Sequence, residues 1–275
     1  MNERKKHLAG YGISGLYLCL LILVLTLPAA SQTPAAQPQA ERAEAIVVRA
    51  VETMGGRRYL DVRSQIGRGR FSLFRDGALV SFQAFYDVIV FPDRERTEFR
   101  NGKSRTVQVN TGDTGWVFDG DQELIKIQTA KQIANFKQGI RTSLDNLLRG
   151  YWRGQAELSY VGRRPSTLGK RNEVVKLRYA DGFEIEFEFA VDDGTPQKAI
   201  YKTTDDDDTT TTEEDRYAQF VDVGGIKAAF IVDRFTNGKQ SSRINYESIE
   251  FNRSVPDSIF TKPSNPKDAK KEFRL

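Results

Sequence analysis

The chain has 275 residues, of which 28% are charged, and its 41 Lys or Arg and 37 Asp or Glu leave a formal net charge of +4. Clustered positive charge supplies most of the affinity for nucleic acid, so a chain this close to charge balance is a poor candidate for nucleic-acid binding. The single histidine, His7, and the single cysteine, Cys19, both lie near the N-terminus.

Residues 1–31 have the order of a secretory signal peptide. Basic residues 4–6 precede an apolar run over 13–27, and Pro28-Ala29-Ala30-Ser31 supplies the small residues of a cleavage site. We expect cleavage before Gln32 and export to the periplasm. An uncleaved inner-membrane anchor is the alternative, because the apolar run approaches the length that a bilayer needs.

Removal of this segment would leave about 244 residues with a net charge of +2 and neither His7 nor Cys19. A histidine-based triad, a Cys–His dyad, a Cys/His zinc site and a structural disulfide are then all excluded. We therefore expect a binding protein and not an enzyme, with no cofactor and no metal site.

The first predicted element after the signal is a helix. Residues 32–39 are rich in Pro, Ala and Gln and predict a flexible spacer. Apolar residues then recur at helical spacing, and Gly55-Gly56 ends the pattern. The apolar positions are Ala43, Ile46, Val47, Ala50, Val51 and Met54.

After Leu60 the apolar period changes to two, which is typical of strands. All even positions over 78–90 are apolar, and apolar residues alternate with Glu184, Glu186 and Glu188 over 183–191. Pairs typical of hairpin turns separate such runs. These pairs are Asp76-Gly77, Asn101-Gly102, Asp119-Gly120, Asp181-Gly182 and Asn237-Gly238.

One long amphipathic helix is predicted within the strands, over 129–149, with Gly150 as its stop. It would either pack on the sheet as part of the core or act as a movable lid. About ten strands and two substantial helices cannot cover both faces of a flat sheet. We expect a mainly-β α+β fold, an antiparallel sheet curled into an unclosed half-barrel around the helices.

Several motifs resemble the LolA-like family of outer-membrane lipoprotein-sorting proteins and periplasmic lipoprotein carriers. The resemblance covers nearly all of the chain after the signal, with the half-barrel at 40–262 and a basic polar tail at 263–275. Its residues are Met54-Gly55-Gly56, the run Phe91 to Glu98, Gly115-Trp116, Val223-Gly224-Gly225-Ile226 and the ending Asn252 to Phe260.

The resemblance implies a non-enzymatic carrier whose concave apolar face takes up acyl chains of a lipid or lipoprotein, with an inner- or outer-membrane protein as a further partner. An envelope sensor or interaction module with a filled interior is the alternative. The strand patterns and two aromatic residues near a turn give the residues expected on the ligand-binding inner face. They are Val80, Phe82, Tyr86, Val88, Trp116, Phe118, Phe183, Ile185 and Phe187.

Three polar features have a functional and a plain interpretation. Glu184, Glu186 and Glu188 have the spacing of a two-carboxylate glycosidase, but a solvated strand face shows the same alternation. The run 205–208 and the threonines after it contain calcium-type ligands without a calcium loop's spacing, which favours a hydrated hairpin tip. A basic set either meets anionic lipid or is scattered surface charge. Its members are Arg141, Arg149, Arg153, Arg163, Arg164, Lys170 and Arg171.

Overall fold

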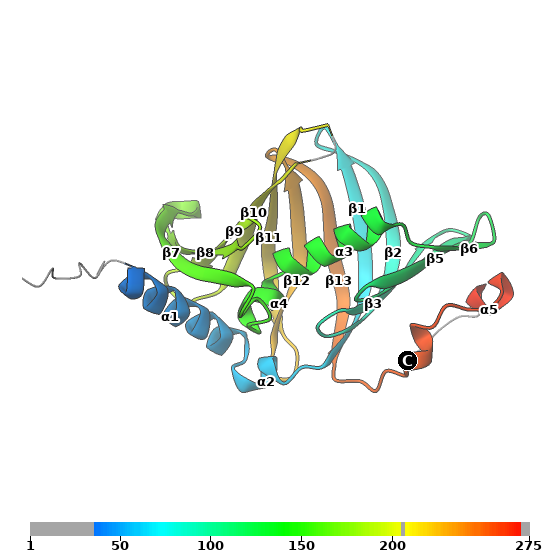
Figure 1. Cartoon of the computed structure of the whole chain (residues 1–275), viewed down its shortest axis with the longest axis horizontal. Helices are drawn as coiled ribbons and strands as arrows, with labels where there is room; N and C mark the ends of the chain where they lie inside the picture. The colour runs from blue at the N-terminus through cyan, green and yellow to red at the C-terminus, as the bar shows by residue number, and fades with distance from the viewer. Residues whose placement is uncertain (1–35, 205–206, 271–275) are drawn as a thin grey trace, which may run out of the picture. The chain divides into compact units, whose positions relative to one another are not determined.

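The computed structural model describes residues 36–204 and 207–270, so the predicted signal peptide, with His7 and Cys19, lies outside the described residues. Its main element is a single antiparallel sheet of 13 strands (Figure 1). The strands are β1 (Ser64–Arg75), β2 (Ala78–Val90), β3 (Arg94–Asn101), β4 (Ser104–Thr111), β5 (Thr114–Asp119), β6 (Leu124–Ile127), β7 (Ala156–Pro165), β8 (Arg171–Tyr179), β9 (Glu184–Ala190), β10 (Pro196–Thr204), β11 (Thr210–Asp222), β12 (Lys227–Thr236) and β13 (Lys239–Phe251).

The sheet consists of two meanders, β1–β6 and β7–β13, which are joined where β1 pairs with β13. Strands β6 and β7 form its two edges, so the sheet is unclosed. It has more strands than the ten expected. Some of the strands, such as the four-residue β6 and the Thr- and acid-rich β11, carry little apolar alternation in their sequences.

The five predicted turn pairs all lie at hairpins between consecutive strands. At two of them both residues adopt positive φ, as a type I′ turn requires. These are Asp76-Gly77, with φ of 51° and 81°, and Asn237-Gly238, with φ of 49° and 76°. The residue pairs at the turns therefore locate the hairpins of the meander directly from the sequence.

The N-terminal helix α1 (Ala36–Met54) is followed by the short α2 (Arg57–Leu60). Helix α1 begins within the segment 32–39 that was expected to be a spacer, so residues 36–39 are helical instead. Its predicted end at Gly55-Gly56 is confirmed. A Cβ atom at Gly55 would lie 2.5 Å from the carbonyl oxygen of Gly225, so only glycine fits there.

The helix expected over 129–149 is two helices, α3 (Ala130–Thr142) and α4 (Leu144–Leu148). Ser143 separates them because its backbone is extended, with φ −70° and ψ 147°, and its side chain caps α4 by accepting from the amide of Asn146. Thr129 and Gln132 form a capping box at the start of α3. Periodicity alone did not reveal this break.

Helices α3 and α4 connect β6 to β7 and therefore run from one edge of the sheet to the other. Thirteen strands spaced about 4.8 Å apart would make a flat sheet about 58 Å wide. Helices of 13 and 5 residues span about 27 Å. The sheet curls, and α3 lies across its concave face (Figure 1).

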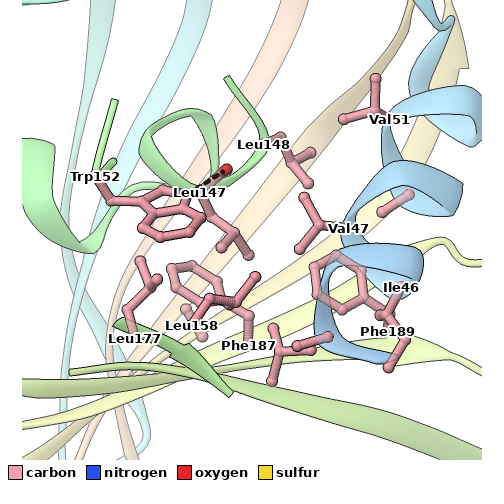
Figure 2. Packing of buried hydrophobic residues seen from close by; sticks show 14 of the residues in the cluster. Ile46, Val47, Val51, Leu147, Leu148, Trp152, Leu158, Leu177, Phe187 and Phe189 are labelled. Atoms are coloured by element: carbon pink, nitrogen blue, oxygen red, sulfur yellow. Dashed lines mark hydrogen bonds between the residues drawn. The ribbon is translucent and has the colours of Figure 1, made fainter. Parts of the chain in front are cut away.

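Two hydrophobic cores lie on opposite faces of the sheet. The first core packs α1 and α4 on the concave face of β8–β10. Figure 2 shows Phe187, Phe189 and Leu177 beneath Val47 of α1 and Leu147 of α4. The second core packs Ile259 and Phe260 on the convex face of β2–β5.

The C-terminal segment contains a 3-10 turn (Asp257–Ile259) and the short helix α5 (Pro266–Lys270). A second 3-10 turn (Thr167–Gly169) joins β7 and β8. Ala269, expected in a polar tail, is 3% exposed and belongs to the second core. No helix among the described residues is both long and apolar enough to cross a membrane.

Candidate functional site

The concave face holds a cavity of about 500 Å³ between α3, α4 and strands β10–β13. Aromatic and aliphatic side chains form most of its sheet wall, which includes Tyr201, Tyr217, Val232, Ile244, Tyr246, Ile249 and Phe251. The roof on α3 is polar or small, with Asn135, Gln138, Gly139 and Thr142. Its size lies within the range of small-molecule sites, and its two walls differ in polarity.

Helix α3 spans this cavity without packing closely on the sheet. Thr142 is its only buried residue among those described, and the apolar Ile133, Phe136 and Ile140 remain half-buried. Apolar side chains of a helix that served only as core would be fully buried. A cavity therefore remains between α3 and the sheet.

The interior is filled at its other end. Ile185 and Phe187 are fully buried in the first core, and Phe189 is 1% exposed. Trp152 closes the layer by donating from Nε1 to the carbonyl oxygen of Leu147 at 3.0 Å (Figure 2). The half-barrel is thus solid beneath α1 and hollow beneath α3.

A polar network borders the cavity where α2 meets α4. Tyr59 donates to Asp145 at 2.7 Å, and Asp145 also accepts from Arg149 Nε at 2.7 Å. The guanidinium of Arg149 lies 4.5 Å from the ring centroid of Tyr59 and 4.2 Å from that of Phe91. This network joins α4 to α2 and to Phe91, and the charges of Asp145 and Arg149 pair with each other.

Three acidic side chains project from the concave face into or beside the hollow region. Asp215 of β11 has one partner, Arg234 of β12, at 3.6 Å. Burial raises the pKa of Asp215, and it raises the pKa of Tyr217 well above its usual value. Asp87 and Glu95 lie on the neighbouring strands β2 and β3.

Asp87 and Glu95 border two further cavities, of about 300 Å³ and 170 Å³. Asp87 is 5% exposed, and its Oδ2 accepts from Tyr246 at 3.4 Å. Its Oδ1 has no hydrogen-bond partner. Burial, and then the charge of Glu95, raise the pKa of Asp87 well above its usual range, and burial also raises the pKa of Glu95.

The nine residues predicted for the inner face do not meet in one place. Strand register puts Tyr86, Val88, Trp116 and Phe118 on the convex face, where all four belong to the second core or pack against it. Ile185, Phe187 and the half-buried Phe183 lie in the first core. Val80 and Phe82 are more than half exposed. None of the nine lines the 500 Å³ cavity.

The concave face of β2 carries the odd positions, Phe85, Asp87 and Ile89, instead of the even ones. Both sets of positions in this strand are rich in apolar residues, so alternation does not distinguish the faces. A usable signal was Asp87 itself, a lone acidic residue within an apolar run. The tyrosines of β10, β11 and β13 carried no such signal.

The other polar features have local partners. Glu184 pairs with Lys176 at 3.1 Å, Glu186 with Arg164 at 2.6 Å, and Glu188 with Arg164 at 3.4 Å. Six of the seven basic residues have an acidic partner within 4 Å. The threonine run begins β11 and pairs with the end of β10 near the tip of their hairpin. Part of the acidic run lies outside the described residues. Within the described part of the chain, no group of three or more His, Cys, Asp or Glu is placed to hold a metal ion.

The sequence matches no protein-family model and no curated protein. Solved structures that share its fold include the following two. A DUF1329 family protein from Desulfovibrio piger aligns with a TM-score of 0.58 and 12% identity, over 81% of this chain and 97% of that one. A LolA superfamily protein from Nitrosomonas europaea aligns with a TM-score of 0.54 and 15% identity, over 80% and 97%.

The alignments cover nearly the whole of both solved chains and four-fifths of this one. The predicted resemblance is confirmed at the level of fold. The structure has the LolA-like fold, an unclosed antiparallel sheet with an N-terminal helix and helices across its concave face.

Proposed function

We propose that this protein is a non-enzymatic carrier that holds the acyl chains of a lipid or lipoprotein beneath α3 during transport or sorting in the cell envelope. The observation that carries the proposal is the 500 Å³ cavity, walled by tyrosine and aliphatic side chains and roofed by a helix that buries only Thr142 among its described residues. Such a space suits a flexible apolar tail.

The envelope location rests on the signal-like order of residues 1–31, and the carrier role is consistent with a fold shared with a LolA superfamily protein. A membrane protein that delivers or receives the lipid is part of the proposal. Helix α3 is the element that would move, because its apolar side chains are only half-buried. Displacing it would expose the tail without disturbing the first core.

Mass spectrometry of organic extracts from the purified full chain tests this proposal. We expect acyl lipids or lipidated peptides in excess of those that accompany a control protein purified in the same way. An extract without such excess, together with no uptake of added lipid, would favour the interaction-module alternative.

A further inference from the structure

Asp87 and Glu95 form a buried acidic pair on adjacent strands of the hollow region. Asp87 is opposite Thr97, two residues from Glu95, and both carboxyl residues border the 300 Å³ and 170 Å³ cavities. Thr97 donates to Glu95 at 2.9 Å, whereas Oδ1 of Asp87 has no partner. A buried carboxylate oxygen without a donor is costly, so this atom points to a missing ligand group.

The charged groups around the pair come from four elements. Arg234 of β12 also faces the pair, but its closest acidic contact is Asp215 of β11, at 3.6 Å. Arg94 of β3 binds Asp257 at 2.6 Å. Arg149 and Asp145 of α4 bind each other at 2.7 Å.

Helix α3 adds only uncharged residues to these two cavities, and β13 adds Tyr246. Among the described residues, neither Asp87 nor Glu95 forms an ion pair, so no cationic side-chain atom lies within 4 Å of either carboxyl group. Apart from the paired Arg94 and Arg149, the described residues therefore place three carboxyl groups, Asp87, Glu95 and Asp215, beside one cation, Arg234.

The acidic pair is continuous with the space proposed for an acyl chain. Arg234, Ile244 and Tyr246 border all three cavities. On the far side of the pair, Phe85 packs edge-on against Tyr246, with ring centroids 5.3 Å apart. Aromatic rings attract cations as well as apolar groups.

We propose that the Asp87–Glu95 pair binds the ammonium head of an amphiphile whose tail lies in the cavity beneath α3, an inference that rests on the proposed carrier function. An ammonium group offers three hydrogen-bond donors, enough for Oδ1 of Asp87 and for Glu95 together. It also supplies the positive charge that the pair lacks. A carboxylate or phosphate head alone would add negative charge to an already acidic, poorly solvated site.

Binding at this site depends on pH. Burial raises the pKa of both carboxyls, so the pair holds protons that an ammonium group must displace. Affinity for an alkyl ammonium ion therefore rises as pH rises through the titration of the pair. Affinity for a neutral alkyl alcohol stays constant over the same range.

The test uses the full chain and measures how well three twelve-carbon compounds displace the neutral fluorescent probe N-phenyl-1-naphthylamine. The compounds are dodecylammonium, dodecanol and dodecanoate, each below its micelle concentration. We expect dodecylammonium to bind at least about tenfold more tightly than dodecanoate at pH 7.5, because a charge-assisted hydrogen bond contributes about that factor.

The double variant Asp87→Asn with Glu95→Gln should bring the two affinities within about threefold of each other. The matched control, Asp192→Asn with Glu247→Gln, changes two exposed carboxyls and should keep the preference. If the double variant does not fold, the rise of dodecylammonium affinity relative to dodecanol between pH 5.5 and 8 replaces it.

Equal binding of dodecylammonium and dodecanoate by the parent, a preference that survives in the double variant, or a flat pH profile would overturn the head-group assignment. Each of these results leaves the carrier proposal standing. If none of the three compounds displaces the probe and none binds, the result would instead contradict the carrier proposal. It would contradict this inference as well.

Discussion

At the scale of single residues, the acidic pair on the concave face is the clearest departure from an ordinary core. Natural interiors pair or neutralise buried carboxylates. Asp87 has only the hydroxyl of Tyr246 at 3.4 Å. Gly67 leaves the space for that ring, since a Cβ atom there would lie 2.4 Å from Tyr246 Cε1. The absence of a side chain at Gly67 thus allows the position of the Tyr246 ring, whose hydroxyl donates to Asp87.

Replacing the pair, Asp87→Asn with Glu95→Gln, should stabilise the fold more at pH 8 than at pH 4.5. The folded pKa of each acid lies above its unfolded value of about 4, so the folded state holds protons that the unfolded state has released. The contribution of these two carboxyls to the free energy of unfolding is complete below about pH 4, their unfolded pKa. It is lost as pH rises through their folded pKa.

The neutral variant lacks this loss, and we expect a gain of about 1–4 kcal/mol at pH 8 in urea unfolding. The exposed control pair, Asp192→Asn with Glu247→Gln, should stay within about 0.5 kcal/mol of the parent. An identical effect of the Asp87–Glu95 variant at both pH values would show that folding does not raise the pKa of the two acids.

Phe187 and Phe82 make a matched comparison, because both were predicted on the inner face. Phe187 is fully buried in the first core, whereas Phe82 is 57% exposed on β2. We expect Phe187→Ala to cost about 3–5 kcal/mol in chemical denaturation and Phe82→Ala less than about 0.5 kcal/mol. Similar losses for the two variants would contradict the positions assigned to them.

At the scale of elements, the C-terminal segment is held by a buried cluster on β3 and β4. Glu98 is fully buried and accepts from both Arg96 and Arg105 at 2.7 Å. These arginines donate to the carbonyl oxygens of Ile259 and Ala269, at 2.8 and 2.6 Å. Burial opposes ionisation of Glu98, but the arginines prevail and lower its pKa.

Glu98→Ala should therefore cost about 3–5 kcal/mol, because it leaves two largely buried arginines without their shared anion. Limited proteolysis should also cut the variant within 255–269 sooner than the parent. Glu247→Ala, which removes an exposed partner of Arg70, serves as control and should have little effect. Unchanged stability of Glu98→Ala would mean that the segment is held by apolar contacts alone.

The sequence predicted some elements well and others poorly, for physical reasons. Turn pairs such as Asn237-Gly238 are local, since a positive φ is a property of the residues themselves. The end of α1 has a local signal too, because Gly55 and Gly56 both adopt positive φ. The break at Ser143 was missed because apolar residues continue at helical spacing through it, while its cap forms only with the amide of Asn146.

At the scale of the molecule, the curled sheet and its covering helices could be predicted, but the hollow region could not. Which face of β2 is concave depends on its register with β1 and β3, and both faces of that strand are apolar. Whether α3 fills the space depends on its distance from strands that are far away in sequence. Neither property is encoded in a local pattern.

The long connection from β6 to β7 also explains why one end is solid and the other hollow. Helix α4 joins α1 on β8–β10, whereas among the described helices α3 is the one that lies across the middle of the sheet (Figure 1). Asn135, Gln138 and Gly139 of α3 face the cavity and are too polar or too small to fill it. The carrier proposal rests on this arrangement.

Gly139 offers the most direct test, because it lines both the 500 Å³ and the 300 Å³ cavities and a Cβ atom there would meet no atom within 4 Å. The measurement is the amount of acyl lipid that co-purifies with, or is taken up by, Gly139→Trp, Gly139→Ala and the parent. We expect the Trp variant to fold and lose at least about nine-tenths of the lipid, a tenfold loss of affinity. The Ala variant should keep its lipid and gain helix stability of about 0.5–1 kcal/mol. Equal lipid content in the folded Trp and Ala variants would contradict binding beneath α3.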